Sequence, residues 1–163
     1  MAPGHPFGFS PIIRYADGGP PPPGYDVSMG TDTSDKNAMR TIRVLIVDDC
    51  PVVRDGLTSL LKTSPVMRIV GEASDGGEAL KSVARLRPDV VLVDAQMPGL
   101  DGVDTTRRIK VRWPEVKVLF LTVHSSYIDD ARAAGADGHL MKDCTARGLI
   151  SAIMEMAGGK LRR

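Results

Sequence analysis

Four of the apolar runs in this chain end in charged or hydroxyl side chains, which can take part in phosphoryl transfer. Asp48 and Asp49 follow one run, and Asp94, Thr122 and Lys142 end three others. A carboxylate is a nucleophile for phosphoryl transfer, while a lysine and a hydroxyl bind the transferred anion. Three carboxylates held close together repel one another, and a hard cation such as Mg²⁺ relieves that repulsion. If the fold gathers these side chains, they predict magnesium-dependent transfer of a phosphoryl group onto an aspartate.

Strands and helices are predicted to alternate from Thr41 onward. Short runs rich in Val, Ile and Leu predict strands, and apolar residues spaced three and four apart predict helices. Gly148 weakens the last helix by about 1 kcal/mol relative to alanine. The predicted strands are 42–47, 67–73, 89–94, 116–122 and 139–142. The predicted helices are 52–61, a segment opened at Asp75, 102–111, 127–134 and 145–157.

This alternation predicts an α/β fold with a parallel sheet. Strands that are apolar on both faces need helices on both faces of the sheet. Five such units fit the flavodoxin-like doubly wound arrangement with strand order 2-1-3-4-5. In that order the first and third strands are neighbours, and all strands end at one edge, where ligands bind. The side chains that end the strands are therefore expected to meet there.

Two further aspartates stand where helices are predicted to begin. Asp75 has Glu78 three residues later, which is the pattern of a capping box. Asp101 directly precedes the predicted helix 102–111 and is suited to cap it. We therefore predict that Asp101 caps a helix and does not belong to the acidic site.

Composition limits the classes of function. The 163 residues carry 21 basic and 20 acidic side chains, a net charge of +1, which gives no electrostatic case for nucleic-acid or membrane binding. The two cysteines form neither a zinc pattern nor a CxxC pair, and they favour a reduced, cytoplasmic setting. No run reaches the roughly 20 apolar residues of a membrane helix, and no secretion signal is recognisable.

The chain is predicted to have three parts. Residues 1–40 hold seven of the 12 prolines and six glycines with few large aliphatic residues, so we expect this segment to be disordered. Residues 41–158 form the folded domain, and 159–163 form a short basic tail. Met29 and Met39 leave open that translation starts later than Met1.

Within the folded part, four motifs resemble the receiver domains of bacterial response regulators. The resemblance covers residues 41 to about 158, and the pieces DDCPVVRDGL and LMKD are most similar to the nitrate-response/quorum-sensing class of these regulators. The motifs are Val47-Asp48-Asp49, the run VDAQMPGLDG at 93–102, Leu121-Thr122 and the run GADGHLMKD at 135–143.

The resemblance implies a role for each residue of the acidic site. Asp94 would be the phosphoacceptor. Mg²⁺ would be bound directly by Asp49, Asp94 and the backbone carbonyl of Gln96, and through water by Asp48. Lys142 would contact the phosphoryl group.

It also implies a conformational switch. Thr122 would move toward the phosphoryl group, and the side chain at position 139 would turn inward. The surface formed by the helix after the fourth strand, the fifth strand and the last helix would then change. His139 stands where the family usually has Tyr or Phe, which weakens the expectation for this step. Gln96 and His124 occupy positions that tune the lifetime of the aspartyl phosphate.

The implied function is that of a phosphoacceptor in a two-component phosphorelay, with a sensor histidine kinase as phosphodonor. Such a protein is not an enzyme, beyond catalysing its own phosphorylation and dephosphorylation. Regulators of this class usually continue into a helix-turn-helix domain, for which the sequence leaves no room. We therefore expect output through a downstream protein or a self-dimer, without direct nucleic-acid or membrane binding. The alternatives are a truncated DNA-binding regulator and a phosphorylation-independent interaction module.

Two other classes fit the sequence less well. A phosphatase with an aspartate nucleophile would need a second aspartate at position 96, which is Gln96. A flavin carrier would need a hydroxyl-rich phosphate loop after the first strand, where Asp48 and Asp49 would repel a phosphate.

Overall fold

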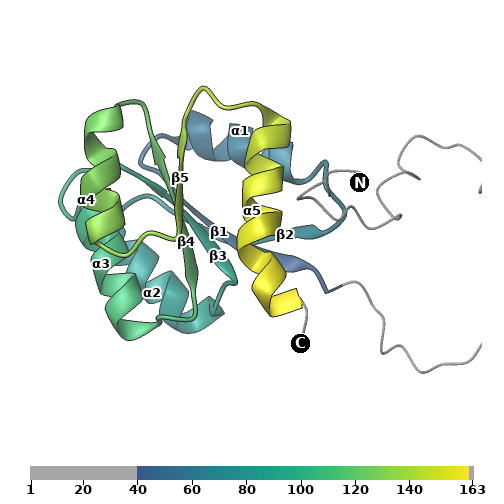
Figure 1. Cartoon of the computed structure of the whole chain (residues 1–163), viewed down its shortest axis with the longest axis horizontal. Helices are drawn as coiled ribbons and strands as arrows, with labels where there is room; N and C mark the ends of the chain where they lie inside the picture. The colour runs from purple at the N-terminus through teal and green to yellow at the C-terminus, as the bar shows by residue number, and fades with distance from the viewer. Residues whose placement is uncertain (1–39, 162–163) are drawn as a thin grey trace, which may run out of the picture. The chain divides into compact units, whose positions relative to one another are not determined.

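Five parallel strands form the centre of the computed structural model, which describes the backbone of residues 40–161 and the side chains of residues 40–158 (Figure 1). The strand order is β2-β1-β3-β4-β5, as predicted. The strands are β1 (Ile42–Val47), β2 (Met67–Ala73), β3 (Val90–Asp94), β4 (Lys117–Thr122) and β5 (Gly138–Met141). The helices are α1 (Pro51–Leu61), α2 (Gly76–Leu86), α3 (Gly102–Arg112), the 3-10 turn η2 (Ser125–Tyr127), α4 (Ile128–Ala133) and α5 (Ala146–Leu161).

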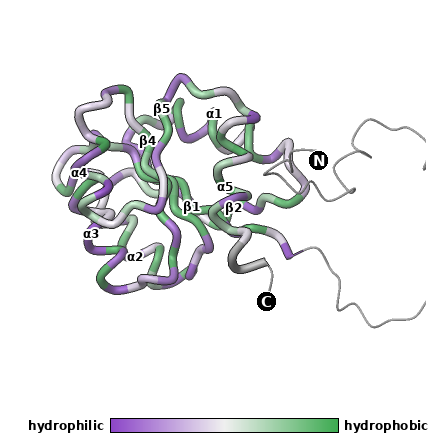
Figure 2. The backbone as a smooth tube through the Cα atoms, in the orientation of Figure 1, coloured by the Kyte–Doolittle hydropathy of each residue, from purple (hydrophilic) through white to green (hydrophobic). Residues whose placement is uncertain are grey.

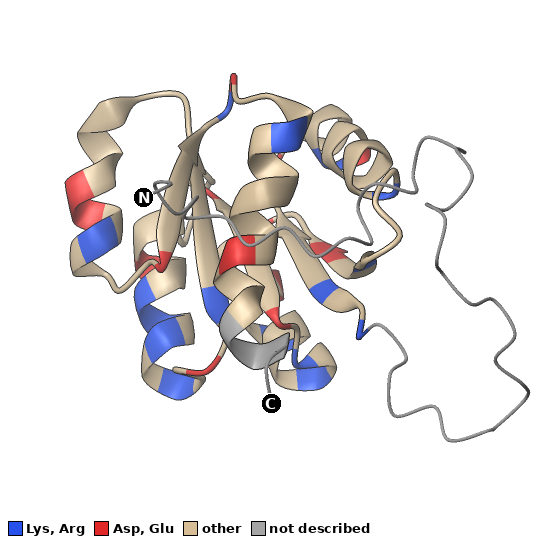
Figure 3. Cartoon of the chain, turned by 45° about the vertical axis from the view of Figure 1, so that its right-hand side comes forward, with Lys and Arg blue, Asp and Glu red and all other residues tan. Residues whose placement is uncertain are grey.

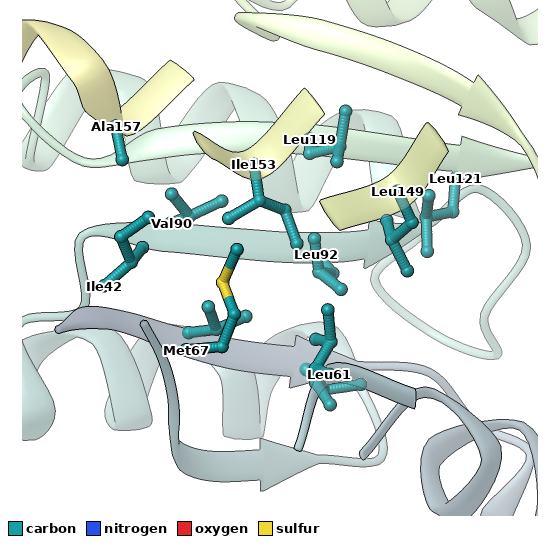
Figure 4. Packing of buried hydrophobic residues seen from close by; sticks show 12 residues of the cluster. Ile42, Leu61, Met67, Val90, Leu92, Leu119, Leu121, Leu149, Ile153 and Ala157 are labelled. Atoms are coloured by element: carbon teal, nitrogen blue, oxygen red, sulfur yellow. The ribbon is translucent and has the colours of Figure 1, made fainter. Parts of the chain in front are cut away.

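Helices cover both faces of the sheet, because successive strand residues point to opposite sides. On one side, Leu61 of α1 and Leu149 and Ile153 of α5 belong to one buried cluster with Ile42 of β1 and Leu92 of β3 (Figure 4). On the other side, α2 and α3 pack against a second cluster of strand residues that includes Leu45 and Val47. β1, β3 and β4 are the most continuously hydrophobic strands, and β1 lies within the green, hydrophobic centre of the tube in Figure 2.

α4 lies on the same side of the sheet as α2 and α3. Its buried residue Ala131 packs with Phe120 of β4 and with Ala95, which directly follows β3. Phe120 is two residues from Val118, which belongs to the cluster beneath α2 and α3, so both point to this face. This third cluster connects α4 to the residue that follows Asp94.

Several predicted helix boundaries were wrong. α3 ends at Arg112, α4 ends at Ala133 and α5 begins at Ala146, each one residue from the prediction, and three further differences have a physical reason. α1 begins at Pro51, one residue early, because the first position of a helix does not need the N–H that proline lacks. The helix predicted from Tyr127 is a 3-10 turn, Ser125–Tyr127, followed by α4, and Gly135 (φ +96°) follows its C-cap. α5 continues to Leu161, so glycines 158 and 159 lower helix propensity without ending the helix.

Strand boundaries differ from the prediction by one residue at several ends. β3 begins at Val90 and β4 at Lys117, each one residue late. β5 runs from Gly138 to Met141, because Thr122 and Met141 are its last paired residues with β4. Lys142 therefore lies just beyond the strand, although its backbone N–H still donates to the Thr122 carbonyl at 2.8 Å.

The predicted helix caps are confirmed. The Asp75 carboxylate accepts from the Glu78 N–H, and the Asp101 carboxylate accepts from the Asp104 N–H, both at 2.8 Å. The Glu78 side chain does not close the box on the N-cap Asp75 but reaches Ser74, the residue before it, accepting from both its backbone N–H and its hydroxyl. The Asp101 carboxylate is thus used to cap α3, as predicted.

Several expectations lie outside the described residues. They concern disorder in the N-terminal segment up to residue 39, the choice of start codon and the last two residues of the tail. Within residues 40–161, no helix has the length and apolar character that crossing a membrane requires.

An ion-pair network joins α3 to the start of β4 and to the turn before β5. Asp137, whose side chain is 19% exposed, accepts from the Nζ atoms of Lys110 and Lys117 at 2.9 and 3.2 Å. It also accepts from the Val118 N–H at 2.9 Å. Lys110 is one of several basic residues along α3 (Figure 3). Burial favours a higher pKa for the Asp137 carboxyl, but the Val118 and lysine hydrogen bonds outweigh it and lower the pKa.

We expect Asp137→Asn to lower the free energy of unfolding by about 1 kcal/mol near neutral pH, because two lysines lose their shared counter-charge at a partly exposed site. A depressed carboxyl pKa stabilises the fold above the unfolded pKa of about 3.9, and this contribution is lost as pH falls through the folded pKa. The deficit of the variant, measured by urea denaturation, should therefore shrink as pH is lowered. The control is Asp129→Asn, at a side chain that is 94% exposed. An equal loss in both variants would contradict this role for Asp137.

Candidate phosphoacceptor site

Parallel pairing of β1 with β3 brings the acidic residues together. Val47 pairs with Val93, so the residues that follow them, Asp48 and Asp94, lie side by side at the carboxyl edge of the sheet. Asp49 continues from Asp48 into the loop before α1. Each of the three aspartates offers a carboxylate oxygen, and these oxygens lie within 4.8 Å of one another. The predicted cluster of three carboxylates is confirmed.

The three aspartates differ in burial. Asp48 and Asp94 are 1% and 5% exposed, whereas Asp49 is exposed. Burial raises the pKa of Asp94, and the nearby Asp48 charge adds to this effect. The Lys142 hydrogen bond and charge, and a hydrogen bond from the Gln96 backbone, oppose the rise without cancelling it. Burial disfavours the charged form of this carboxyl, and a cation close to it offsets that effect.

Lys142 bridges the two buried carboxylates. Its Nζ lies 2.8 Å from Oδ2 of Asp48 and 2.9 Å from Oδ1 of Asp94. Burial tends to lower the pKa of Lys142, but hydrogen bonds to Asp48 and Asp94 and their charges outweigh burial and raise it. The ammonium group therefore stays charged and screens the two carboxylates from each other.

Asp48 has no carboxylate oxygen left without a partner. Its Oδ1 accepts from the Cys50 N–H at 2.9 Å, and its Oδ2 accepts from Lys142. Arg54 of α1 additionally donates to the Asp48 backbone carbonyl at 2.6 Å. Asp48 is thus held by the loop and by the first turn of α1, whereas Asp49 is free to take a ligand from solvent.

Gly102 brings the start of α3 against the backbone of Asp94. A Cβ at this position would overlap the Asp94 carbonyl oxygen and press on Ala95, both of them backbone atoms that cannot yield. The Gly102 N–H also donates to the Ala95 carbonyl at 3.1 Å. A side chain here would displace either α3 or the end of β3.

The Thr122 hydroxyl is close to the site but is occupied by its own loop. Thr122 is 1% exposed, and its Oγ1 donates to the His124 carbonyl at 2.9 Å and accepts from the His124 N–H at 3.0 Å. Among the described residues, no hydrogen bond joins this hydroxyl to Asp94. The structure therefore does not bring Thr122 into contact with the carboxylates.

The other predicted residues lie around the site at the surface. His124 is exposed in the loop after β4, and His139 is exposed on β5. Gln96 is exposed two residues after Asp94, and its Nε2 donates to the hydroxyl of Tyr127 at 3.0 Å. Sequence reasoning gave Tyr127 no role beyond starting a helix, since nothing in the sequence signals a contact across 31 positions.

Taken together, the geometry offers a nucleophile, a counter-charge and oxygen ligands in one place. The donor set consists of hard carboxylate oxygens and contains no histidine or thiolate in the described part of the chain, so it fits Mg²⁺ better than zinc or copper. Asp94 is held by Lys142 on one oxygen, and the exposed Asp49 opens the cluster to solvent. This arrangement suits an acceptor of small anionic groups.

Comparison with known proteins agrees with this chemistry. Residues 44–154 match the family model described as the response regulator receiver domain. The transcriptional regulatory protein DegU of Brevibacillus brevis is 38% identical over 120 residues, covering 72% of this chain and 51% of DegU. The response regulator protein VraR of Staphylococcus aureus is 38% identical over 125 residues, covering 74% of this chain and 58% of VraR. The chain thus spans little more than half the length of these relatives.

The fold is also that of a solved receiver domain. The signal receiver domain of the putative response regulator NarL from Mycobacterium tuberculosis superposes with a TM-score of 0.70 and 34% sequence identity. The match covers 74% of this chain and 98% of the NarL structure.

We expect Lys142→Met to lower the free energy of unfolding by about 2 kcal/mol, because Asp48 and Asp94 would keep their charges without a shared cation. Urea denaturation in metal-free buffer measures the loss. The matched control is Lys62→Met, at an exposed lysine after α1 for which residues 40–161 show no ion pair. If the two variants lose equal stability, Lys142 does not hold the carboxylates together.

Proposed function

Since the chain belongs to the family of response regulator receiver domains, we propose that it accepts a phosphoryl group on Asp94 from a sensor histidine kinase in a two-component phosphorelay. The observation that carries this proposal is the bridge from Lys142 to Asp94 inside the carboxylate cluster. Apart from this self-phosphorylation and the later loss of phosphate, we propose no enzyme activity, and we propose that the chain acts in the cytoplasm.

In the transfer step, a carboxylate oxygen of Asp94 forms a bond to the phosphorus of a phosphohistidine. The bond between phosphorus and the histidine nitrogen breaks, and that nitrogen keeps the electron pair. Lys142 already contacts Oδ1 of Asp94, so its positive charge lies next to the incoming phosphoryl oxygens. Transfer of this kind depends on positioning and charge neutralisation, which Lys142 supplies.

The proposed metal is Mg²⁺, with Asp49, Asp94 and the backbone carbonyl of Gln96 as direct ligands. When bound, it would offset the charge of the carboxylates and of the phosphoryl oxygens. Asp48 is proposed to act through water. Both of its carboxylate oxygens already accept hydrogen bonds, from the Cys50 N–H and from Lys142, which supports an indirect role.

The proposed switch begins at Thr122. To reach a phosphoryl group on Asp94, its hydroxyl must give up both hydrogen bonds to His124. His139 is exposed on β5, in pockets bordered by α4 on one side and by α5 on the other. Its inward turn would therefore alter the α4-β5-α5 surface, which a downstream protein or a second copy of the chain would recognise.

The form of the output is a separate part of the proposal. The relatives extend well beyond the region that this chain matches, and one of them is called a transcriptional regulatory protein. We favour output through protein contacts, without direct nucleic-acid or membrane binding. A truncated DNA-binding regulator and a phosphorylation-independent interaction module are the alternatives.

A small acyl phosphate tests the transfer directly. With Mg²⁺ present, the intact mass of the wild-type protein should increase by one phosphoryl group, whereas Asp94→Asn should gain none because the nucleophile is missing. Chelation of Mg²⁺ should abolish the gain in wild type. Asp55→Asn, a change at an exposed aspartate of α1, is the matched control and should behave as wild type. Wild type that gains no mass, or Asp94→Asn that does, would overturn the proposed function.

Gln96→Ala and His124→Ala should each still take up a phosphoryl group but should lose it at a changed rate, because both side chains lie on the loops that surround Asp94. Decay is followed by intact mass after the donor is removed. Decay at the wild-type rate in both variants would contradict a role of these two positions in setting the lifetime of the aspartyl phosphate.

A further inference from the structure

The carboxamide of Gln96 is tied to a tyrosine on a different loop. Its Nε2 donates to the Tyr127 hydroxyl at 3.0 Å, and within the described residues it makes no hydrogen bond to the carboxylates of the site. Gln96 lies in the loop after β3, whereas Tyr127 ends η2 in the connection from β4 to α4. One hydrogen bond therefore joins the two loops that border Asp94.

The tyrosine is the fixed partner of this pair. Its ring packs against the buried cluster of Ala95, Phe120 and Ala131, so the cores of β4 and α4 determine where the hydroxyl lies. The exposed Gln96 side chain is long and would otherwise sample many rotamers. Tyr127 therefore selects the position of the carboxamide.

Gln96 is anchored to the site through its backbone. Gln96 directly follows Ala95, whose N–H donates to the Leu121 carbonyl at 2.8 Å and whose carbonyl accepts from the Gly102 N–H at 3.1 Å. Only the Gln96 side chain can change its direction while these bonds persist. A carboxamide so close to a phosphorylated carboxylate can orient a water molecule for attack on phosphorus, since it both donates and accepts hydrogen bonds.

We propose that Tyr127 is a positioning residue that holds the Gln96 carboxamide away from Asp94 and thereby lengthens the life of the aspartyl phosphate. This inference rests on the proposed phosphorylation of Asp94. In the hydrolysis that it slows, a water oxygen bonds to phosphorus and the bond from phosphorus to the Asp94 oxygen breaks. The carboxylate keeps the electron pair, and inorganic phosphate leaves after the water gives up a proton to solvent.

The same contacts connect the lifetime to the switch. The His124 carbonyl accepts hydrogen bonds from both the Thr122 hydroxyl, at 2.9 Å, and the Tyr127 N–H, at 3.4 Å. The turn that carries Tyr127 and the hydroxyl of the switch residue Thr122 therefore share one acceptor.

Tyr127→Phe keeps the packed ring and removes only the acceptor. After phosphorylation by an acyl phosphate and removal of the donor, we expect intact mass to show phosphoryl loss about fivefold faster than in wild type, the change that loss of one neutral hydrogen bond produces. In the unphosphorylated protein, the side-chain amide NMR signals of Gln96 should shift while the rest of the spectrum is retained. Tyr25→Phe is the matched control for the chemical change.

The double variant with Gln96→Ala separates positioning from a general structural effect. If Tyr127 acts through Gln96, Tyr127→Phe has no effect on decay in the Gln96→Ala background. Wild-type decay in the single variant, or equal acceleration in both backgrounds, overturns the inference while leaving phosphorylation intact. If the wild-type protein takes up no phosphoryl group at all, the proposed function fails, and this inference fails with it.

Discussion

Two buried carboxylates, Asp48 and Asp94, share the single ammonium group of Lys142, and the rest of the site depends on this arrangement. The register of β1 and β3 makes the two aspartates neighbours, and their repulsion would be costly in a buried setting. Lys142 comes from the far end of the sequence, just after β5, and lies 2.8 and 2.9 Å from the two carboxylates. The repulsion between Asp48 and Asp94 is therefore relieved only once β5 has joined the sheet and brought Lys142 to them.

Two loops at the carboxyl edge of the sheet, β1–α1 and β4–α4, differ in how firmly hydrogen bonds hold them. Asp48 is held by Lys142, by the Cys50 N–H and through its backbone by Arg54. The β4–α4 connection instead depends on a few hydrogen bonds that involve Thr122 and His124. Such a division suits the proposed phosphorylation and switch, because the proposed nucleophile needs a fixed position, whereas a segment that switches needs two positions of similar free energy.

Family membership and geometry support different statements about this chain. The match over residues 44–154 and the identity to DegU and VraR establish the receiver family. The distances at Asp94 and Lys142 supply a physical reason for the proposed phosphoryl acceptance.

The sequence by itself determined the sheet order, the helix caps at Asp75 and Asp101 and the meeting of the three aspartates. It could do so because hydrophobic periodicity and the parallel fold place every strand end at one edge. Strand boundaries shifted by one residue, as at β5, because cross-strand pairing sets them. Only the tertiary structure decided that Thr122 bonds to His124, that both oxygens of Asp48 are taken, and that Tyr127 reaches Gln96. Each of these contacts depends on which rotamer a side chain adopts, and the space left by packed neighbours selects that rotamer. The spacing of residues along the sequence carries no information about it.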